Sequence, residues 1–106
     1  MKTVSILGST GSVGRSTVDL ILSQFSSFAV QVITAQTNVA LLAEQARALK
    51  VKRAVIGDEH LFESLKDMLA GTGIEVAAGR DAIIEAGAYP AQCIVAAIVG
   101  MGGLSR

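Results

Sequence analysis

The stretch Gly8-Ser9-Thr10-Gly11-Ser12-Val13-Gly14 decides the fold of this 106-residue chain. It follows the apolar run Val4–Leu7 and precedes Val13–Leu22, where apolar residues recur at helical spacing. A strand, a glycine-rich turn and a helix in this order are typical of the first βαβ unit of a nucleotide-binding sheet. The spacing is Gly-x-x-Gly-x-x-Gly rather than the commoner Gly-x-Gly-x-x-Gly, so an ordinary glycine-capped turn is the alternative.

The residue types in this turn suit the binding of a pyrophosphate. Side chains would keep the anion away from the main chain, so glycines are needed where it approaches closely. The free N–H groups and the positive dipole end of the following helix attract the anion, and hydroxyl groups add donors. We therefore expect a dinucleotide to contact Gly8, Ser9, Thr10, Gly11, Ser12, Val13 and Gly14.

Composition narrows the class of protein. Nine Lys and Arg residues balance nine Asp and Glu residues, so no charge excess points to nucleic acid or a membrane surface. No apolar run is long enough to span a bilayer, and the first residues have no signal-peptide pattern. Cys93 is the single cysteine, which excludes an internal disulfide framework and favours a cytoplasmic location.

Strands and helices alternate along the chain, which predicts a Rossmann-like, doubly wound parallel sheet in a single α/β domain over residues 1–106. The expected strands are Lys2–Leu7, Val30–Ala35, Arg53–Gly57, Ile74–Ala78 and Gln92–Val99, the last of these central because it is the most apolar. The expected helices are Ser12–Ser23, a segment capped by Asn38 that runs to about Leu49, a segment from the cap Asp58 to Gly71, and Asp81–Ala86. A loop is expected over Gly87–Pro90.

The first helix is expected to turn Val13, Thr17, Leu20 and Ile21 toward the sheet, with Val18 and Leu22 beside them. In a sheet of this kind the first and last strands end side by side at the switch point of the topology, where cofactors bind. This places the segment Ala97, Ile98, Val99 and Gly100, with Gly102 and Gly103 behind it, beside the glycine-rich turn. A plain turn is the alternative for these glycines.

The end of the second strand indicates which dinucleotide is bound. NAD sites usually place a carboxylate there for the ribose 2′-hydroxyl, whereas this chain has Gln36, Thr37 and Asn38. A carboxylate would repel a 2′-phosphate, so its absence favours NADP, although no Lys or Arg stands in the segment either. A loop and helix cap is the alternative role of these residues.

No catalytic or metal-binding pattern is present. His60 is expected on the surface and Cys93 as a small buried hydrophobe, and neither has a second ligand at metal-binding spacing. Asp58, Asp81 and Glu85 are interpreted as helix caps and helix-end charges. Nothing forms a nucleophile–base pair or a carboxylate dyad.

The whole chain resembles the start of the 1-deoxy-D-xylulose 5-phosphate reductoisomerase family. The resemblance rests on Val4–Asp19, Thr37-Asn38-Val39, Lys52–Ile56, and Ala96–Gly100 followed by Gly103-Leu104. It implies an NADPH-binding domain with contacts at Thr10–Val13, Gln36–Asn38 and Ala97–Gly100. Many relatives have Gly and then Lys or Arg where this chain has Gln36 and Thr37.

The resemblance also implies an oxidoreductase of non-mevalonate isoprenoid biosynthesis, which converts deoxyxylulose phosphate to methylerythritol phosphate. The family uses NADPH with Mg²⁺ or Mn²⁺, and its intact enzyme is expected to be a homodimer. Its metal ligands and substrate-phosphate residues would lie beyond Arg106, so we expect an incomplete domain with no turnover by itself. Another NADP oxidoreductase, of the semialdehyde dehydrogenase or dihydrodipicolinate reductase type, and a non-catalytic nucleotide-sensing module are the alternatives.

Overall fold

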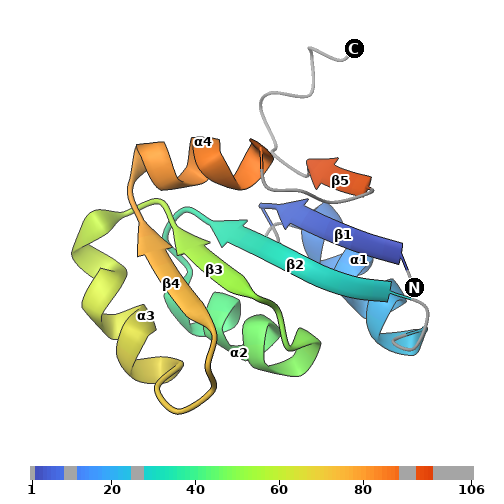
Figure 1. The fold of residues 1–106 in the computed structure, drawn as a ribbon, viewed down its shortest axis with the longest axis horizontal. Coiled ribbons are helices and arrows are strands. Elements are labelled where there is room, and N and C mark those ends of the chain that lie inside the picture. Colours follow the sequence, from blue (N-terminus) through green and yellow to red (C-terminus); the bar gives the residue numbers. More distant parts are fainter. Residues whose placement is uncertain (1, 9–11, 25–27, 89–92, 97–106) are drawn as a thin grey trace.

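The computed structural model describes residues 2–8, 12–24, 28–88 and 93–96. Their elements follow the chain in an alternating order (Figure 1). The strands are β1 (Lys2–Leu7), β2 (Phe28–Ala35), β3 (Arg53–Ile56), β4 (Glu75–Ala78) and β5 (Cys93–Ala96). The helices are α1 (Ser12–Ser23), α2 (Val39–Leu49), the 3₁₀ helix η2 (Glu59–Leu61), α3 (Phe62–Met68) and α4 (Arg80–Ala88).

The strands form a five-stranded sheet in the order β4-β3-β2-β1-β5, and every neighbouring pair is parallel. From β1 the chain steps outward through β2, β3 and β4, and it then crosses back to the free side of β1 as β5 (Figure 1). The direction of winding therefore reverses between β1 and β5. The predicted doubly wound parallel sheet is confirmed.

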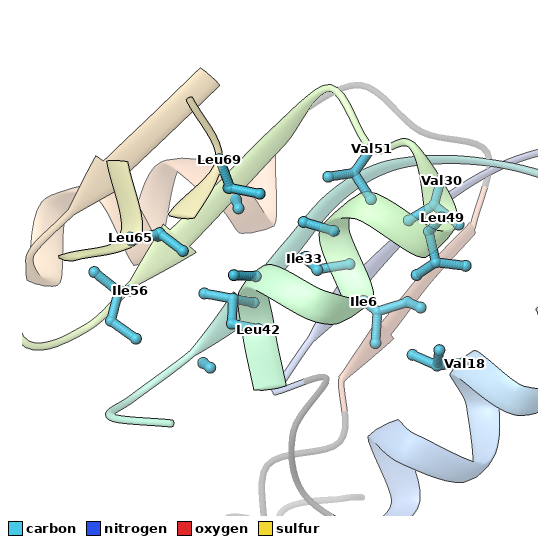
Figure 2. Packing of buried hydrophobic residues seen from close by; sticks show 14 of the residues in the cluster. Ile6, Val18, Val30, Ile33, Leu42, Leu49, Val51, Ile56, Leu65 and Leu69 are labelled. Carbon is cyan, nitrogen blue, oxygen red and sulfur yellow. The ribbon is translucent and has the colours of Figure 1, made fainter. Parts of the chain in front are cut away.

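Helices cover both faces of the sheet. On one face, α1, α2 and α3 enclose the larger apolar cluster, in which Leu42 and Leu49 of α2 lie among side chains from β1, β2 and β3 (Figure 2). On the other face, Ala86 of α4 packs against Val32 and Val55 in a smaller cluster. Strands buried on both faces need apolar residues at successive positions, which explains the abundance of Val, Ile and Ala.

A β-bulge in β2 sets which side chains reach each cluster. Val4 pairs with Val30 but Ser5 pairs with Val32, so Gln31 is an additional residue in β2. Side chains alternate between the faces of a regular strand, and the additional residue reverses this alternation. As a result, Val30 and Ile33 both enter the larger cluster, while Val32 enters the smaller one.

The prediction of which face of the first helix is buried was wrong in part. Gly14, Val18 and Ile21 are buried, whereas Leu20 is 59% and Leu22 39% exposed. Residues 14, 18 and 21 lie on one stripe at the helical period, and residue 20 lies about 100° away from residue 21. Apolar character alone therefore did not identify the buried face.

Several boundaries also differ. The second strand begins at Phe28 rather than Val30, because Phe28 and Ala29 pair with Lys2 and Thr3. Gly87 and Ala88 belong to α4 and not to a loop, and the helix lies so close to β1 that a Cβ on Gly87 would be 3.8 Å from Leu7 Cδ1.

The structure describes only part of the last predicted strand. Of the segment Gln92–Val99, residues 93–96 are described, and within the described sheet β5 is at the outer position next to β1 rather than in the centre. The remaining residues of that segment, and the predicted loop at 89–90, lie outside the described residues.

Replacement of a residue in the larger cluster should be costly. Leu42 is fully buried, so Leu42→Ala is expected to lower the free energy of unfolding by about 2–5 kcal/mol through lost burial and a cavity. The matched control Leu20→Ala, at an exposed site of α1, is expected to change it by less than about 0.5 kcal/mol. Urea unfolding followed by circular dichroism measures both, and equal effects would contradict the packing described.

Candidate functional site: the carboxyl edge of the sheet

The carboxyl ends of all five strands meet at one edge of the sheet, since every strand is parallel to its neighbours (Figure 1). At this edge Leu7 of β1 pairs with Ala96 of β5. The expectation that the first and last strands end side by side is therefore confirmed. In open parallel sheets, ligands bind in the crevice outside such a switch point.

Gly8 begins the turn that follows β1. Its φ of 82° lies in the left-handed region, which side chains disfavour and glycine adopts readily. Its N–H donates to the carbonyl oxygen of Thr34 at 3.1 Å and to the Oγ1 atom of Thr34 at 2.9 Å. The turn is therefore attached to the end of β2 at its first residue.

The rest of the predicted turn is described in part. Ser12 and Val13 open α1, and Gly14 is buried in its first turn. Ser9, Thr10 and Gly11 lie outside the described residues, as do Ala97, Ile98, Val99 and Gly100 after β5.

The charge at the helix N-termini is unequal along the carboxyl edge. The first turns of α1 and α2 hold no acidic residue, whereas those of η2, α3 and α4 hold Glu59, Glu63 and Asp81. An acidic side chain offsets the positive end of the helix dipole. The part of the edge formed by β1 and β2 is consequently the part suited to an anion.

The predicted segment after β2 is exposed and close to the N-terminus of α2. Asn38 caps that helix, because its side-chain oxygen accepts from the N–H of Leu41 at 3.3 Å. The cap uses the amide oxygen, so the amide nitrogen of Asn38 remains a donor for a ligand. Both alternatives considered for Asn38, a helix cap and a ligand contact, are compatible with this geometry.

The side chain of Gln36 lies over Gly57, in the space that a Cβ on this glycine would occupy. The backbone carbonyl oxygen of Gln36 accepts from the backbone N–H of Asp58 at 3.0 Å. The segment after β2 is therefore joined to the turn after β3, which holds it in place without a charged side chain.

The turn after β3 carries two of the acidic groups of this edge, Asp58 and Glu59. Asp58 Oδ1 accepts from the backbone N–H of His60 at 2.9 Å and lies 3.1 Å from His60 Nδ1. The backbone hydrogen bond from His60, followed by the contact with its ring, lowers the pKa of the Asp58 carboxyl from its ordinary value. The predicted cap at Asp58 and the surface position of His60, whose side chain is 97% exposed, are confirmed.

The turn after β4 packs closely against the segment after β3. Gly79, after β4, has a φ of 100°, and a Cβ there would lie 2.6 Å from Glu59 Oε2. In the part of the chain that the structure describes, no three His, Cys, Asp or Glu side chains form a group able to hold a metal ion. The carboxyl edge thus provides backbone and neutral donors near β1 and β2, and carboxylates near β3 and β4.

Thr34 was missed by the sequence analysis. It ends a β-branched run, and its type and position do not distinguish it from a buried strand residue. Only the pairing of β1 with β2 reveals that its side chain reaches the turn after the neighbouring strand.

Together, the sheet order and the glycine turn at the switch point define the chain as a Rossmann-like, dinucleotide-binding type of α/β domain. A sequence model of the 1-deoxy-D-xylulose 5-phosphate reductoisomerase family matches residues 4–106. The chain belongs to this family. This result separates it from the semialdehyde dehydrogenase and dihydrodipicolinate reductase types of NADP oxidoreductase that the sequence left open.

Individual relatives agree with the family match. The reductoisomerase of Gluconobacter oxydans is 54% identical over 101 residues, which cover 95% of this chain and 25% of that protein. The reductoisomerase of Rhizobium rhizogenes is 48% identical over 104 residues, which cover 96% and 26%. The chain therefore spans about a quarter of the length of these curated relatives.

Solved structures give the same result. The reductoisomerase from Zymomonas mobilis in complex with NADPH superposes with a TM-score of 0.92 at 46% identity, over 96% of this chain and 27% of that chain. A second reductoisomerase, in complex with NADPH, fosmidomycin and magnesium, gives a TM-score of 0.87 at 26% identity, over 98% of this chain and 26% of that chain.

Among the described residues, no helix is long and apolar enough to cross a membrane.

The pKa of Asp58 makes a pH-dependent prediction. A carboxyl whose pKa is lowered by folding stabilises the protein above its unfolded pKa of 3.8, and this contribution disappears as the pH falls through the lower folded value. Asp58→Asn keeps the shape but not the charge. We expect wild type to melt at a higher temperature than this variant at pH 6, and the two melting temperatures to converge on acidification below pH 3.8. A difference in melting temperature that does not depend on pH would contradict this account.

Proposed function

We propose that this chain is the NADPH-binding portion, over residues 1–106, of a 1-deoxy-D-xylulose 5-phosphate reductoisomerase. The parent enzyme rearranges and reduces deoxyxylulose phosphate to methylerythritol phosphate in non-mevalonate isoprenoid biosynthesis. The observation that carries the proposal is the glycine turn attached to β2 at the β1–β5 switch point. The relative that superposes with a TM-score of 0.92 is described in complex with NADPH, which supports the choice of cofactor.

The pyrophosphate is proposed to bind over the turn between β1 and α1. Gly8, Gly11 and Gly14 allow the anion close to the main chain, and Ser9, Thr10, Ser12 and Val13 supply hydroxyl or backbone donors. The fit is electrostatic as well as steric, because the first turn of α1 contains no carboxylate that would oppose the anion.

The 2′-phosphate is proposed to bind beside Gln36, Thr37 and Asn38. These residues carry no carboxylate, all three are exposed, and the cap leaves the Asn38 amide nitrogen available. Neutral donors hold a phosphate less strongly than a cation does, because charge-assisted hydrogen bonds contribute about 1.5–3 kcal/mol each. Preference for NADPH over NADH is therefore expected to be modest.

We assign the nicotinamide half of the cofactor to Ala97, Ile98, Val99 and Gly100. These residues follow β5, the strand that pairs with the end of β1. NADPH supplies the hydride for the reduction, and this chain's residues bind and orient it.

We assign the divalent metal, Mg²⁺ or Mn²⁺, and the sugar phosphate to residues of the parent enzyme other than these 106. A hard cation needs several oxygen ligands in a fixed arrangement, and the described acidic residues gather no such set. The proposal also includes a homodimeric, cytoplasmic parent enzyme.

Titration of the chain with NADPH and NADH is the direct test of the proposed function. Nicotinamide fluorescence should report saturable binding of both, with NADPH bound more tightly, because the segment after β2 repels no 2′-phosphate. Gly11→Val should abolish binding of both cofactors with little loss of helix content, since a branched side chain blocks the approach to the main chain. The proposed NADPH site would be rejected if NADH bound more tightly than NADPH, or if the Gly11→Val variant bound the cofactors about as tightly as wild type.

A charge at residue 38 should separate the two cofactors. Asn38→Asp keeps a capping oxygen at the start of α2, so the melting temperature should stay unchanged or rise. The new carboxylate repels a 2′-phosphate but accepts from a 2′-hydroxyl. We expect NADPH affinity to fall by about tenfold or more while NADH affinity is kept or increased. Equal effects on both cofactors would place the adenosine ribose elsewhere.

A further inference from the structure

A buried hydroxyl at the carboxyl edge contacts the glycine-rich turn and is not among the groups assigned to the cofactor. Thr34, on β2, is 3% exposed, and its Oγ1 atom accepts the Gly8 N–H at 2.9 Å. The same N–H also reaches the Thr34 carbonyl oxygen at 3.1 Å. A single donor is thus held between two acceptors of one residue.

The carbonyl contact continues the regular pairing of β1 with β2, which would exist with any residue at position 34. The hydroxyl contact depends on the side chain. The bulge at Gln31 reverses the alternation of β2, so Thr34 shares a face with Val32 and with the smaller cluster under α4. Valine has the shape of threonine without the hydroxyl, so the contact with the Gly8 N–H depends on a hydroxyl at position 34.

Gly8 is the residue at which the chain leaves β1. Its φ of 82° is one of several that a glycine adopts at little cost, so glycine alone does not fix the direction of the turn. Two acceptors on the Gly8 N–H select one orientation of its peptide group. Gly8 is thereby fixed at the end of β1, and the residues proposed to donate to the pyrophosphate follow it in the chain.

We propose that Thr34 is a positioning residue for dinucleotide binding: its hydroxyl holds Gly8, the first residue of the pyrophosphate turn, in a fixed orientation before the cofactor arrives. The inference rests on the proposed function and adds a residue that does not touch the cofactor. If the first residue of the turn is fixed in advance, the cofactor is spared the cost of fixing it, so the effect appears in affinity. Because both cofactors contain the pyrophosphate, NADPH and NADH should benefit equally.

Ser5 provides a matched control on β1. It is fully buried, and in the described part of the chain its hydroxyl is the one buried side-chain group with no hydrogen-bond partner. Ser5→Ala and Thr34→Val each remove one buried hydroxyl from adjacent strands. Only the second removes a contact to the turn.

The experiment measures the dissociation constants of NADPH and NADH for the full chain and for Thr34→Val, Thr34→Ser and Ser5→Ala, well below each melting temperature. Thr34→Val should weaken both cofactors by the same factor, about three- to tenfold, as expected for loss of one hydrogen bond. Thr34→Ser restores the hydroxyl and should stay within about twofold of wild type, as should Ser5→Ala.

Each result that differs from these expected dissociation constants leads to a different conclusion. Wild-type affinity in Thr34→Val overturns the positioning role, and so does a loss confined to NADPH, which would move the effect to the 2′-phosphate segment. An equal loss in Ser5→Ala would reduce Thr34 to a packing residue. If the wild-type chain binds neither cofactor, the proposed function itself fails.

Hydrogen exchange of the wild-type chain tests the premise that Gly8 is ordered before the cofactor arrives, and this test remains available if Thr34→Val does not fold. In the cofactor-free chain the Gly8 amide should already exchange slowly, and added NADPH should change its rate little. A fast Gly8 amide that becomes protected only with NADPH would overturn the proposal, because the turn would then be ordered by the cofactor.

Discussion

The structure depends on β1 being paired along both of its edges, with β2 on one side and β5 on the other. A strand in this position is buried on both faces, which accounts for the fully buried Ser5 and Ile6. It also leaves the turn after β1 between two strand ends, one of which supplies the acceptors for Gly8. The location of the candidate site is thus a consequence of sheet order.

The sheet order further determines the charge at the candidate site. β2, β3 and β4 lie progressively further from β1, and each is followed by its own helical segment. Among the described helices, acidic residues occur in the first turns of η2, α3 and α4, which follow β3 and β4. The helices that follow β1 and β2 keep the positive ends of their dipoles without an acidic neighbour in the first turn. A neutral chain with 9 cations and 9 anions can therefore present a local anion site without any basic patch.

Much of the fold was predictable from local patterns. β1 and α1 were placed to the residue, because a glycine-rich turn separates an apolar run from a helical one. Asn38 and Asp58 were recognised as caps because their side chains satisfy N–H groups only a few residues away. The errors occurred where a distant segment decided the outcome: Phe28 joined β2 through its pairing with Lys2, and Leu20 stayed exposed because the sheet contacts α1 on another side.

The sequence by itself determined the alternation of strands and helices, the glycine-rich turn, the neutral segment at Gln36–Asn38 and the family to which the chain belongs, since each is encoded in residues that are close together. The tertiary structure alone decided the outer position of β5 in the described sheet, the bulge at Gln31, and the contact from Thr34 to Gly8. Gly8 and Thr34 are 26 residues apart in the chain. Which side chain reaches such a distant turn depends on strand register, and a change of one residue in register moves every side chain of the strand to the opposite face.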